Sequence, residues 1–191
     1  KLKYERPDFD VLYLRNQGYW YLGGLKGIGK NITHTISFLK NEFAKYDKII
    51  CTGSSAGGYA SMLFGSLCSV NYVVNMMGQI DLEYVLKELP ERWTRTINDQ
   101  PNRLNRTTLK LKRRKQQCPK TWEAYKDLSK HINTTNTTYY VSYKNPDEYN
   151  DIEDEIYHGI FHYNKIKDFS SVHKISSRED ALSTIIDCLN K

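Results

Sequence analysis

Long apolar runs are missing from this 191-residue sequence. No stretch approaches the roughly 18 to 20 apolar residues of a membrane-spanning helix, and the N-terminus lacks the charged-then-apolar layout of a signal peptide. The four cysteines are scattered without a C-x-x-C pair, which favours reduced thiols and a cytoplasmic location. Asn-x-Ser/Thr triplets leave a secreted glycoprotein as the alternative.

Acidic residues are missing from one conspicuous segment. The chain carries 28 Lys and Arg against 22 Asp and Glu, a formal charge of +6, and the excess gathers in "LKLKRRKQQ", residues 109–117. A solvated basic face would explain this segment, and so would an anionic partner such as a phosphate-bearing polymer, a cofactor phosphate or nucleic acid. Nucleic acid is not our prediction, because aromatic residues do not interleave with the cations and no nucleic-acid motif is present.

Strand and helix patterns alternate along most of the chain. This alternation predicts one α/β domain over residues 1–191, with a mostly parallel sheet and helices on both faces. The expected strands are 10–16, 48–53, 71–78, 137–145 and 168–176. The expected helices are 31–46, 55–68, 151–166 and 178–190, and Asn31 is available as the N-cap of the first. Residues 81–131 are polar and interrupt the alternation of strand and helix patterns. We therefore predict that they form a helical cap insertion over the carboxyl ends of the strands.

The most specific motif lies in "CTGSSAGG", residues 51–58. Gly53, Ser55 and Gly57 match G-x-S-x-G, after an expected strand and before an expected helix, which is the context of a nucleophile elbow. Small residues two positions either side relieve clashes on such a tight turn. A phosphate loop would need a lysine after the glycines or G-x-G-x-x-G spacing, and neither is present. We therefore interpret Ser55 as a nucleophile and Ser54 as a bystander.

Backbone N–H groups next to the elbow would form the oxyanion hole. Ala56 supplies the first donor at the helix N-terminus, and Gly18 or Tyr19 in the glycine-rich loop is the candidate for the second. Trp20 beside them could stack on a sugar or an adenine, or could simply fill the base of the loop.

A serine nucleophile needs a base, and the base needs an acid that orients it, in the chain order Ser, acid, His. Asp151 or Asp147 is the expected acid, unless each only caps a helix. His173 is our candidate for the base. His158 and His162 lie i,i+4 without an H-E-x-x-H pattern, and we predict no metal site.

The segments "GYWYLGGLKGIG", "IICTGSSAGGYASMLFG" and "NPDEYNDIEDEI" resemble α/β-hydrolase-like proteins of bacterial polysaccharide and glycoprotein export clusters, and among these the capsular polysaccharide O-acetyltransferases. The resemblance implies that Ser55 takes acetyl from acetyl-CoA and delivers it to a hydroxyl of a capsular polysaccharide, with phosphate-linked N-acetylhexosamine polymers as one acceptor class. Lys112, Arg113 and Arg114 would then meet phosphates of the polymer or of CoA. It also implies a cytoplasmic enzyme at the inner face of the membrane, with other capsule-assembly enzymes as partners.

The chain departs from this family at one position. The family's catalytic histidine tends to stand at the opening of the last helix, where this sequence has Ala181. His173 serves instead, or the chain is an inactive relative, or alanine has been introduced in place of histidine at 181. A carbohydrate esterase or deacetylase of the same fold and a non-catalytic carbohydrate-binding relative are the alternative functions.

Overall fold

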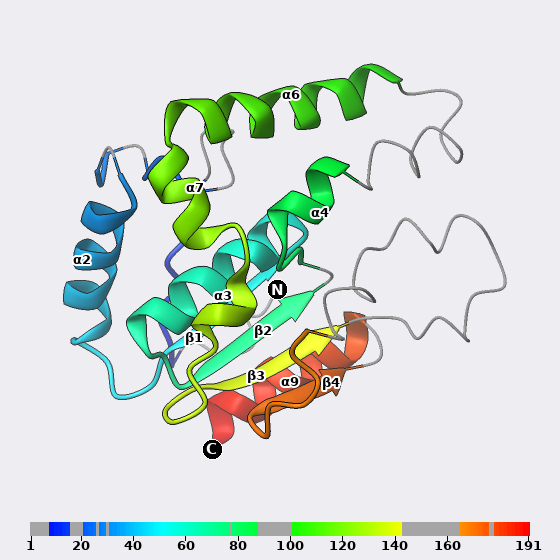
Figure 1. The fold of residues 1–191 in the computed structure, drawn as a ribbon. Helices are drawn as coiled ribbons and strands as arrows, with labels where there is room; N and C mark the ends of the chain where they lie inside the picture. Colours follow the sequence, from blue (N-terminus) through cyan, green and yellow to red (C-terminus); the bar gives the residue numbers. More distant parts are fainter. Residues whose placement is uncertain are drawn as a thin grey trace, which may run out of the picture.

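The computed structural model describes residues 8–15, 21–25, 27–29, 31–76, 78–87, 101–142, 165–175 and 178–191. A four-stranded sheet lies at the centre of the described part of the chain (Figure 1). Its strands are β1 (Ile50–Ser54), β2 (Tyr72–Met76), β3 (Thr138–Ser142) and β4 (Val172–Ile175). They lie in the order β1-β2-β3-β4, and each neighbouring pair is parallel. The predicted α/β class and parallel sheet are confirmed.

All four strands end at one edge of the sheet. The register aligns Ser54 with Met76, Met76 with Ser142, and Ser142 with Ile175. β-branched and aromatic residues dominate these short strands, as expected for segments that pack on both faces of a parallel sheet. Ligand-binding sites of open parallel sheets form outside the carboxyl ends of the strands. We therefore expect the functional site at this edge.

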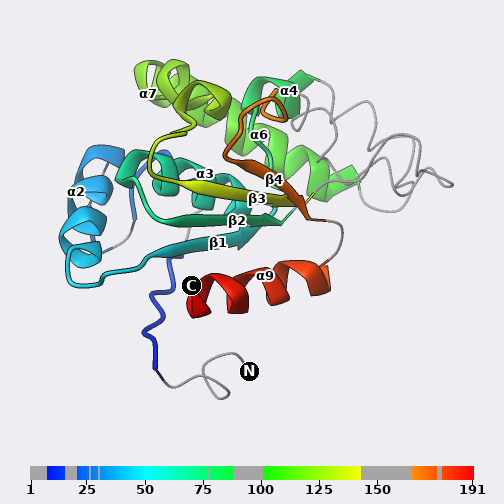
Figure 2. The same cartoon turned by 90° about the horizontal axis from the view of Figure 1, so that it is seen from below.

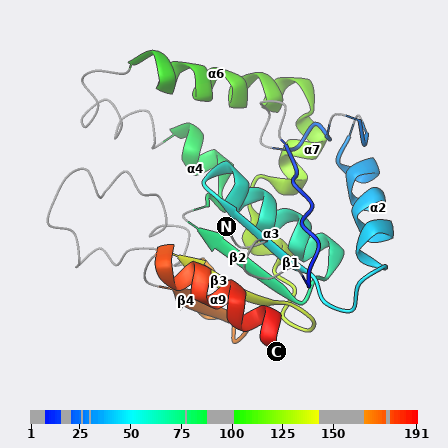
Figure 3. The ribbon, with the colours of Figure 1, turned by 180° about the vertical axis from the view of Figure 1, so that it is seen from behind.

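Helices cover both faces of the sheet. The helical elements are α2 (Ile32–Phe43), α3 (Ala56–Cys68), α4 (Leu82–Lys87), α6 (Pro101–Gln117), α7 (Pro119–Tyr125), the 3-10 helix η1 (Leu128–His131) and α9 (Arg178–Asn190). Of the described helices, α9 is the one that covers the second face of the sheet, as Figures 2 and 3 show. On the other face, α3 packs against β1 and β2, and α2 and η1 pack against α3.

The larger core lies between α3 and the sheet. Tyr59, Leu63 and Phe64 of α3 meet Val73 and Tyr139 of the strands there, and each is at most 1% exposed. Successive side chains of a strand point to opposite faces. Val74 and Ile175 accordingly turn the other way and form a second, smaller cluster with α9.

The chain begins α2 as predicted but does not form the first expected strand. The side chain of Asn31 accepts a hydrogen bond from the His34 N–H at 2.9 Å and so caps α2. The described residues 10–15 form no strand, and Tyr13 is 85% exposed. That prediction was wrong because an apolar run makes a buried strand only when a neighbour pairs with it, and only Leu14 packs on the core.

The described part of the insertion 81–131 packs on α3. Trp122 of α7 is fully buried, and the hydroxyl of Tyr59 donates to the Tyr125 carbonyl at 2.8 Å. The two ends of the insertion are tied together, since the Leu82 N–H donates to the Lys126 carbonyl at 2.7 Å. No helix in the described ranges is both long and apolar enough to cross a membrane.

Candidate active site

Ser55 occupies a strained turn between β1 and α3. Its backbone angles are φ 54° and ψ −119°. The Ser55 N–H donates to the Met76 carbonyl at 3.0 Å, and its carbonyl accepts from the Tyr59 N–H at 3.1 Å. These bonds to β2 and to α3 hold a conformation that costs a non-glycine residue about 1–3 kcal/mol. Strain of this kind concentrates at functional sites, and it occurs here at the residue that the motif singles out.

A second serine shows why this strain is unusual. Ser69 also has φ 54°, but its ψ of 48° is the ordinary left-handed conformation of a residue that ends a helix, here α3. The ψ of Ser55 lies far from that value, so helix termination does not explain it. The Ser55 conformation belongs to a sharp strand-to-helix elbow.

Ser55 is an exposed residue whose hydroxyl does not cap α3. A serine at the start of a helix usually accepts a hydrogen bond from a backbone N–H two or three residues later. Ser55 makes no such capping bond, and the residue is exposed at the carboxyl edge of the sheet. Its Oγ is therefore not occupied by helix capping.

The two glycines of the motif play different roles. A Cβ atom on Gly53 would collide with the carbonyl group of Gly57 and lie 3.0 Å from the Gly57 Cα. A Cβ atom on Gly57 would meet nothing within 4 Å. The interpretation that small residues are needed on both sides of Ser55 is right for Gly53, whereas the Gly57 site has room for a side chain.

Asn75 of β2 contacts the residues next to the elbow, and sequence reasoning missed it. Its buried Oδ1 accepts from the Gly78 N–H at 2.7 Å. A Cβ atom on Gly58 would lie 2.6 Å from the Gly78 Cα and would also meet that Oδ1. Asn75 therefore packs between the chain after β2 and the first turn of α3. Its signal was a polar residue inside the apolar run "NYVVNMMG".

The expected first oxyanion donor, Ala56, lies at the N-terminus of α3. Ala56 is the first residue of α3, and the first four N–H groups of a helix have no partner within it. Gly18, Tyr19 and Trp20 lie outside the described residues. The segment that follows them is anchored on α3, because the ring of Tyr21 packs edge-on against Phe64 with centroids 6.1 Å apart.

The structure does not bring His173 to Ser55. His173 lies on β4 in register with Tyr140, and its ring packs against the Tyr140 ring with centroids 5.4 Å apart. β4 and β1 are separated by three strand spacings, or about 14 Å. A general base must come within hydrogen-bond reach of its proton, so this position does not support His173 as the base.

Ala181 also lies away from the elbow. It is fully buried on α9 and packs with Val74 and Ile175. A histidine at 181 would place its imidazole in this apolar cluster instead of beside Ser55. The position of Ala181 therefore does not support a vacated base at this site.

The remaining candidates divide between the described and the undescribed parts of the chain. His34 is exposed on α2, and His131 lies in η1, where its Nε2 is 2.7 Å from the Ala124 carbonyl oxygen. Neither makes a hydrogen bond to Ser55. The candidate acids Asp147 and Asp151, together with His158 and His162, lie outside the described residues. In the described ranges, no group of three or more His, Cys, Asp or Glu side chains could hold a metal ion.

The three candidate cations of the basic segment have different environments. Lys112 and Arg113 are exposed on α6. Arg114 is only 9% exposed, and its Nη1 donates to the Cys118 Sγ at 2.9 Å. A Cβ atom on Gly23 would lie 2.7 Å from the Arg114 Cζ. Arg114 therefore packs against the loop that leads to α2, and this position does not support it as a substrate contact.

A charged cluster holds α4, α6 and α7 together. The Glu83 carboxylate accepts from the Lys115 Nζ at 2.6 Å and from the Trp122 Nε1 at 2.7 Å. Partial burial acts to raise the pKa of Glu83, but the hydrogen bonds from Lys115 and Trp122 outweigh it, so this pKa lies below its ordinary value. A shallow depression of about 360 Å³ opens beside the cluster between α6 and α7.

Comparison with known proteins gives no match. No family model, no curated protein and no solved structure matches this chain. The functional interpretation therefore depends on the geometry of the elbow.

Proposed function

We propose that this chain is an α/β-hydrolase-like acyltransferase that carries an acetyl group on Ser55, from acetyl-CoA to a hydroxyl of a carbohydrate polymer. The observation that supports this most strongly is the backbone of Ser55, strained at φ 54° and ψ −119° in an exposed residue whose hydroxyl caps no helix. Packing alone gives no reason for a serine in this conformation, whereas a nucleophile elbow requires it.

In the first step a base removes the proton of the Ser55 hydroxyl while Oγ attacks the thioester carbonyl of acetyl-CoA. The N–H of Ala56 and a second donor stabilise the resulting oxyanion. The oxyanion collapses and the C–S bond breaks, so that the CoA thiol leaves with the proton from the base. The same base then removes the proton of a sugar hydroxyl while the sugar oxygen attacks the acetyl-serine ester. The bond between the acetyl carbon and Ser55 Oγ breaks, the base returns the proton to Oγ, and the acetyl group stays on the sugar.

By elimination, a histidine base would be His158 or His162. The other three histidines are described, and none of them makes a hydrogen bond to Ser55. Both remaining histidines follow Asp147 and Asp151, so they keep the chain order Ser, acid, His. Alanine at the true base should slow the labelling of Ser55 by a serine-reactive phosphonate, and alanine at the other histidine should leave the rate near that of the wild type.

The elbow serves an esterase as well as a transferase, because both form the same acyl-enzyme and differ in whether water or a sugar hydroxyl resolves it. Incubation with acetyl-CoA followed by intact-mass measurement tests the shared step. An acetyl adduct that survives in water and is lost when oligosaccharide is added supports the transferase. An adduct lost equally fast in water alone would support the esterase, and no phosphonate labelling of Ser55 would refute both.

A further inference from the structure

The outer helix α6 carries exposed cations that pair with no acidic side chain in the described part of the chain. Lys110, Lys112 and Arg113 are exposed on α6, and Lys120 is exposed at the start of α7; these four residues are the basic face. No Asp or Glu occurs between residues 101 and 122. In the described part of the chain, no ion pair is formed by any of the four.

The neighbouring cations of the same segment have structural explanations. Arg114 is buried and bonded to Cys118, and Lys115 pairs with Glu83. Both also lie in the last turn of α6, where positive charge is stabilised by the helix dipole. These contacts account for Arg114 and Lys115 but not for the basic face.

The basic face is electrostatically unfavourable in the isolated protein. Lys110 and Arg113 lie i,i+3 on one helix, a spacing at which like charges repel. Lys120 is the second residue of α7, and a cation near a helix N-terminus opposes the helix dipole. An anionic partner would relieve this repulsion, so the arrangement is typical of a polyanion-binding surface.

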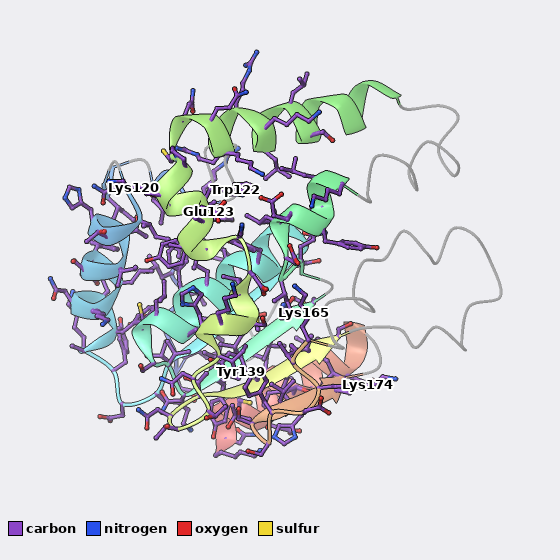
Figure 4. All side chains as sticks on the ribbon, viewed as in Figure 1. Lys120, Trp122, Glu123, Tyr139, Lys165 and Lys174 are labelled. Carbon is purple, nitrogen blue, oxygen red and sulfur yellow. The ribbon has the colours of Figure 1, made fainter. Side chains whose placement is uncertain are left out.

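The location of the basic face suits a partner that reaches Ser55. Figure 1 shows α6 as the outermost helix above α3, and α6 packs on α4. The helix α4 follows the carboxyl end of β2, whose last residue Met76 bonds Ser55. Figure 4 shows Lys120 and Trp122 where α7 meets α6. A long polymer could therefore lie along α6 while another part of it reaches the elbow.

The surface chemistry favours an anionic carbohydrate over a single-stranded nucleic acid. Proteins that bind single strands stack the bases on aromatic side chains. In the described residues of α6 and α7, the one strongly exposed large apolar side chain is Leu109, whereas Trp122 is fully buried. The basic face therefore offers charge without a stacking platform.

We propose that the basic face binds an anionic carbohydrate polymer and holds it for reaction at Ser55. The carbohydrate class of this partner rests on the proposed acyltransferase function. The bound groups are the phosphates, sulfates or carboxylates of the polymer, and binding is electrostatic and dependent on salt.

Heparin, a sulfated and carboxylated polysaccharide, is the probe. Its binding is measured by fluorescence anisotropy over a series of salt concentrations, starting at about 50 mM. One variant combines Lys110→Gln, Lys112→Gln and Arg113→Gln. The matched control combines Lys40→Gln, Lys130→Gln and Lys167→Gln, which removes the same charge from exposed lysines on other elements.

The α6 variant should bind heparin about tenfold more weakly or worse, and the slope of log K against log salt should fall by about two to three. The control variant should bind nearly as tightly as the wild type. The α6 variant should also melt no lower than the wild type, because it has lost like-charge repulsion. Phosphonate labelling of Ser55, measured in parallel, reports on the proposed acyltransferase function separately.

Three results would overturn the proposal. Equal weakening in both variants would mean that net charge alone attracts heparin. Absence of heparin binding by the wild type at low salt would exclude a polyanion surface. Tighter binding of duplex DNA than of heparin, at equal charge concentration and equal salt, would assign the surface to nucleic acid instead of carbohydrate.

Discussion

Alanine at Gly53 should damage the elbow, whereas alanine at Gly57 should not. The Cβ atom at residue 53 would overlap the carbonyl group of Gly57, which is backbone and cannot rotate away. Overpacking of this kind typically costs about 1–3 kcal/mol. For a domain of this size, that predicts a melting temperature roughly 2–12 °C lower.

The same substitution at Gly57 should raise the stability of the protein instead of lowering it. Gly57 lies in the first turn of α3, has no positive φ, and offers open space to a Cβ atom. Alanine favours a helix over glycine by about 0.5–1 kcal/mol. The melting temperature should therefore rise by roughly 1–4 °C.

Thermal denaturation followed by circular dichroism measures both shifts, and phosphonate labelling at a temperature where both variants are folded reports on Ser55. Gly53→Ala should label more slowly than Gly57→Ala, because the clash displaces the serine from its strained conformation. A wild-type melting temperature and labelling rate for Gly53→Ala would contradict a backbone clash at residue 53. A strong loss of stability for Gly57→Ala would contradict the open space at residue 57.

Three further predictions concern the surroundings of the elbow. Lys165→Met should lower the free energy of unfolding by about 0.5–1 kcal/mol at neutral pH, since Lys165 bonds Asp127 at 3.1 Å. Burial acts to raise the pKa of Asp127, but its hydrogen bonds to Ser129 and Lys165 outweigh it and hold this pKa below its ordinary value. The difference in unfolding free energy between the variant and the wild type, measured by urea titration, should therefore shrink as the pH falls through this lowered pKa. Gly58→Ala should cost about 1–3 kcal/mol by the same assay, because its Cβ atom would meet Asn75; a neutral result would contradict the close approach. Cys51 is partly buried, and desolvation raises the pKa of its thiol to about 12. Iodoacetamide at neutral pH should therefore leave Cys51 unmodified in the native protein, and rapid native-state alkylation would contradict this raised pKa.

The sequence predicted those features that depend on local pattern. The parallel sheet followed from the alternation of apolar strands and helices, and the cap at Asn31 followed from a polar residue before a helical repeat. The elbow motif predicted a sharp turn at Ser55, and the structure has one. Each of these features depends on residues close together in the chain.

Features that depend on distant packing were not predictable in the same way. Chain order left His173 as a base candidate, but the lateral order of the strands places it three strands from Ser55. Strand order is a property of the whole sheet and is not encoded in local spacing. Arg114 is a partial exception, because it lies three residues after the buried Leu111 and so shares its face of α6. That spacing could have indicated its burial.

The most direct test of Ser55 as the nucleophile is the intact mass of the protein after incubation with acetyl-CoA, compared with a Ser55→Ala control. If Ser55 is the nucleophile, the wild type gains one acetyl group and the control gains none, with both proteins equally folded. The same acetyl adduct on Ser55→Ala, or no acetyl adduct and no phosphonate labelling at Ser55 in the folded wild type, would contradict the claim that Ser55 is the nucleophile.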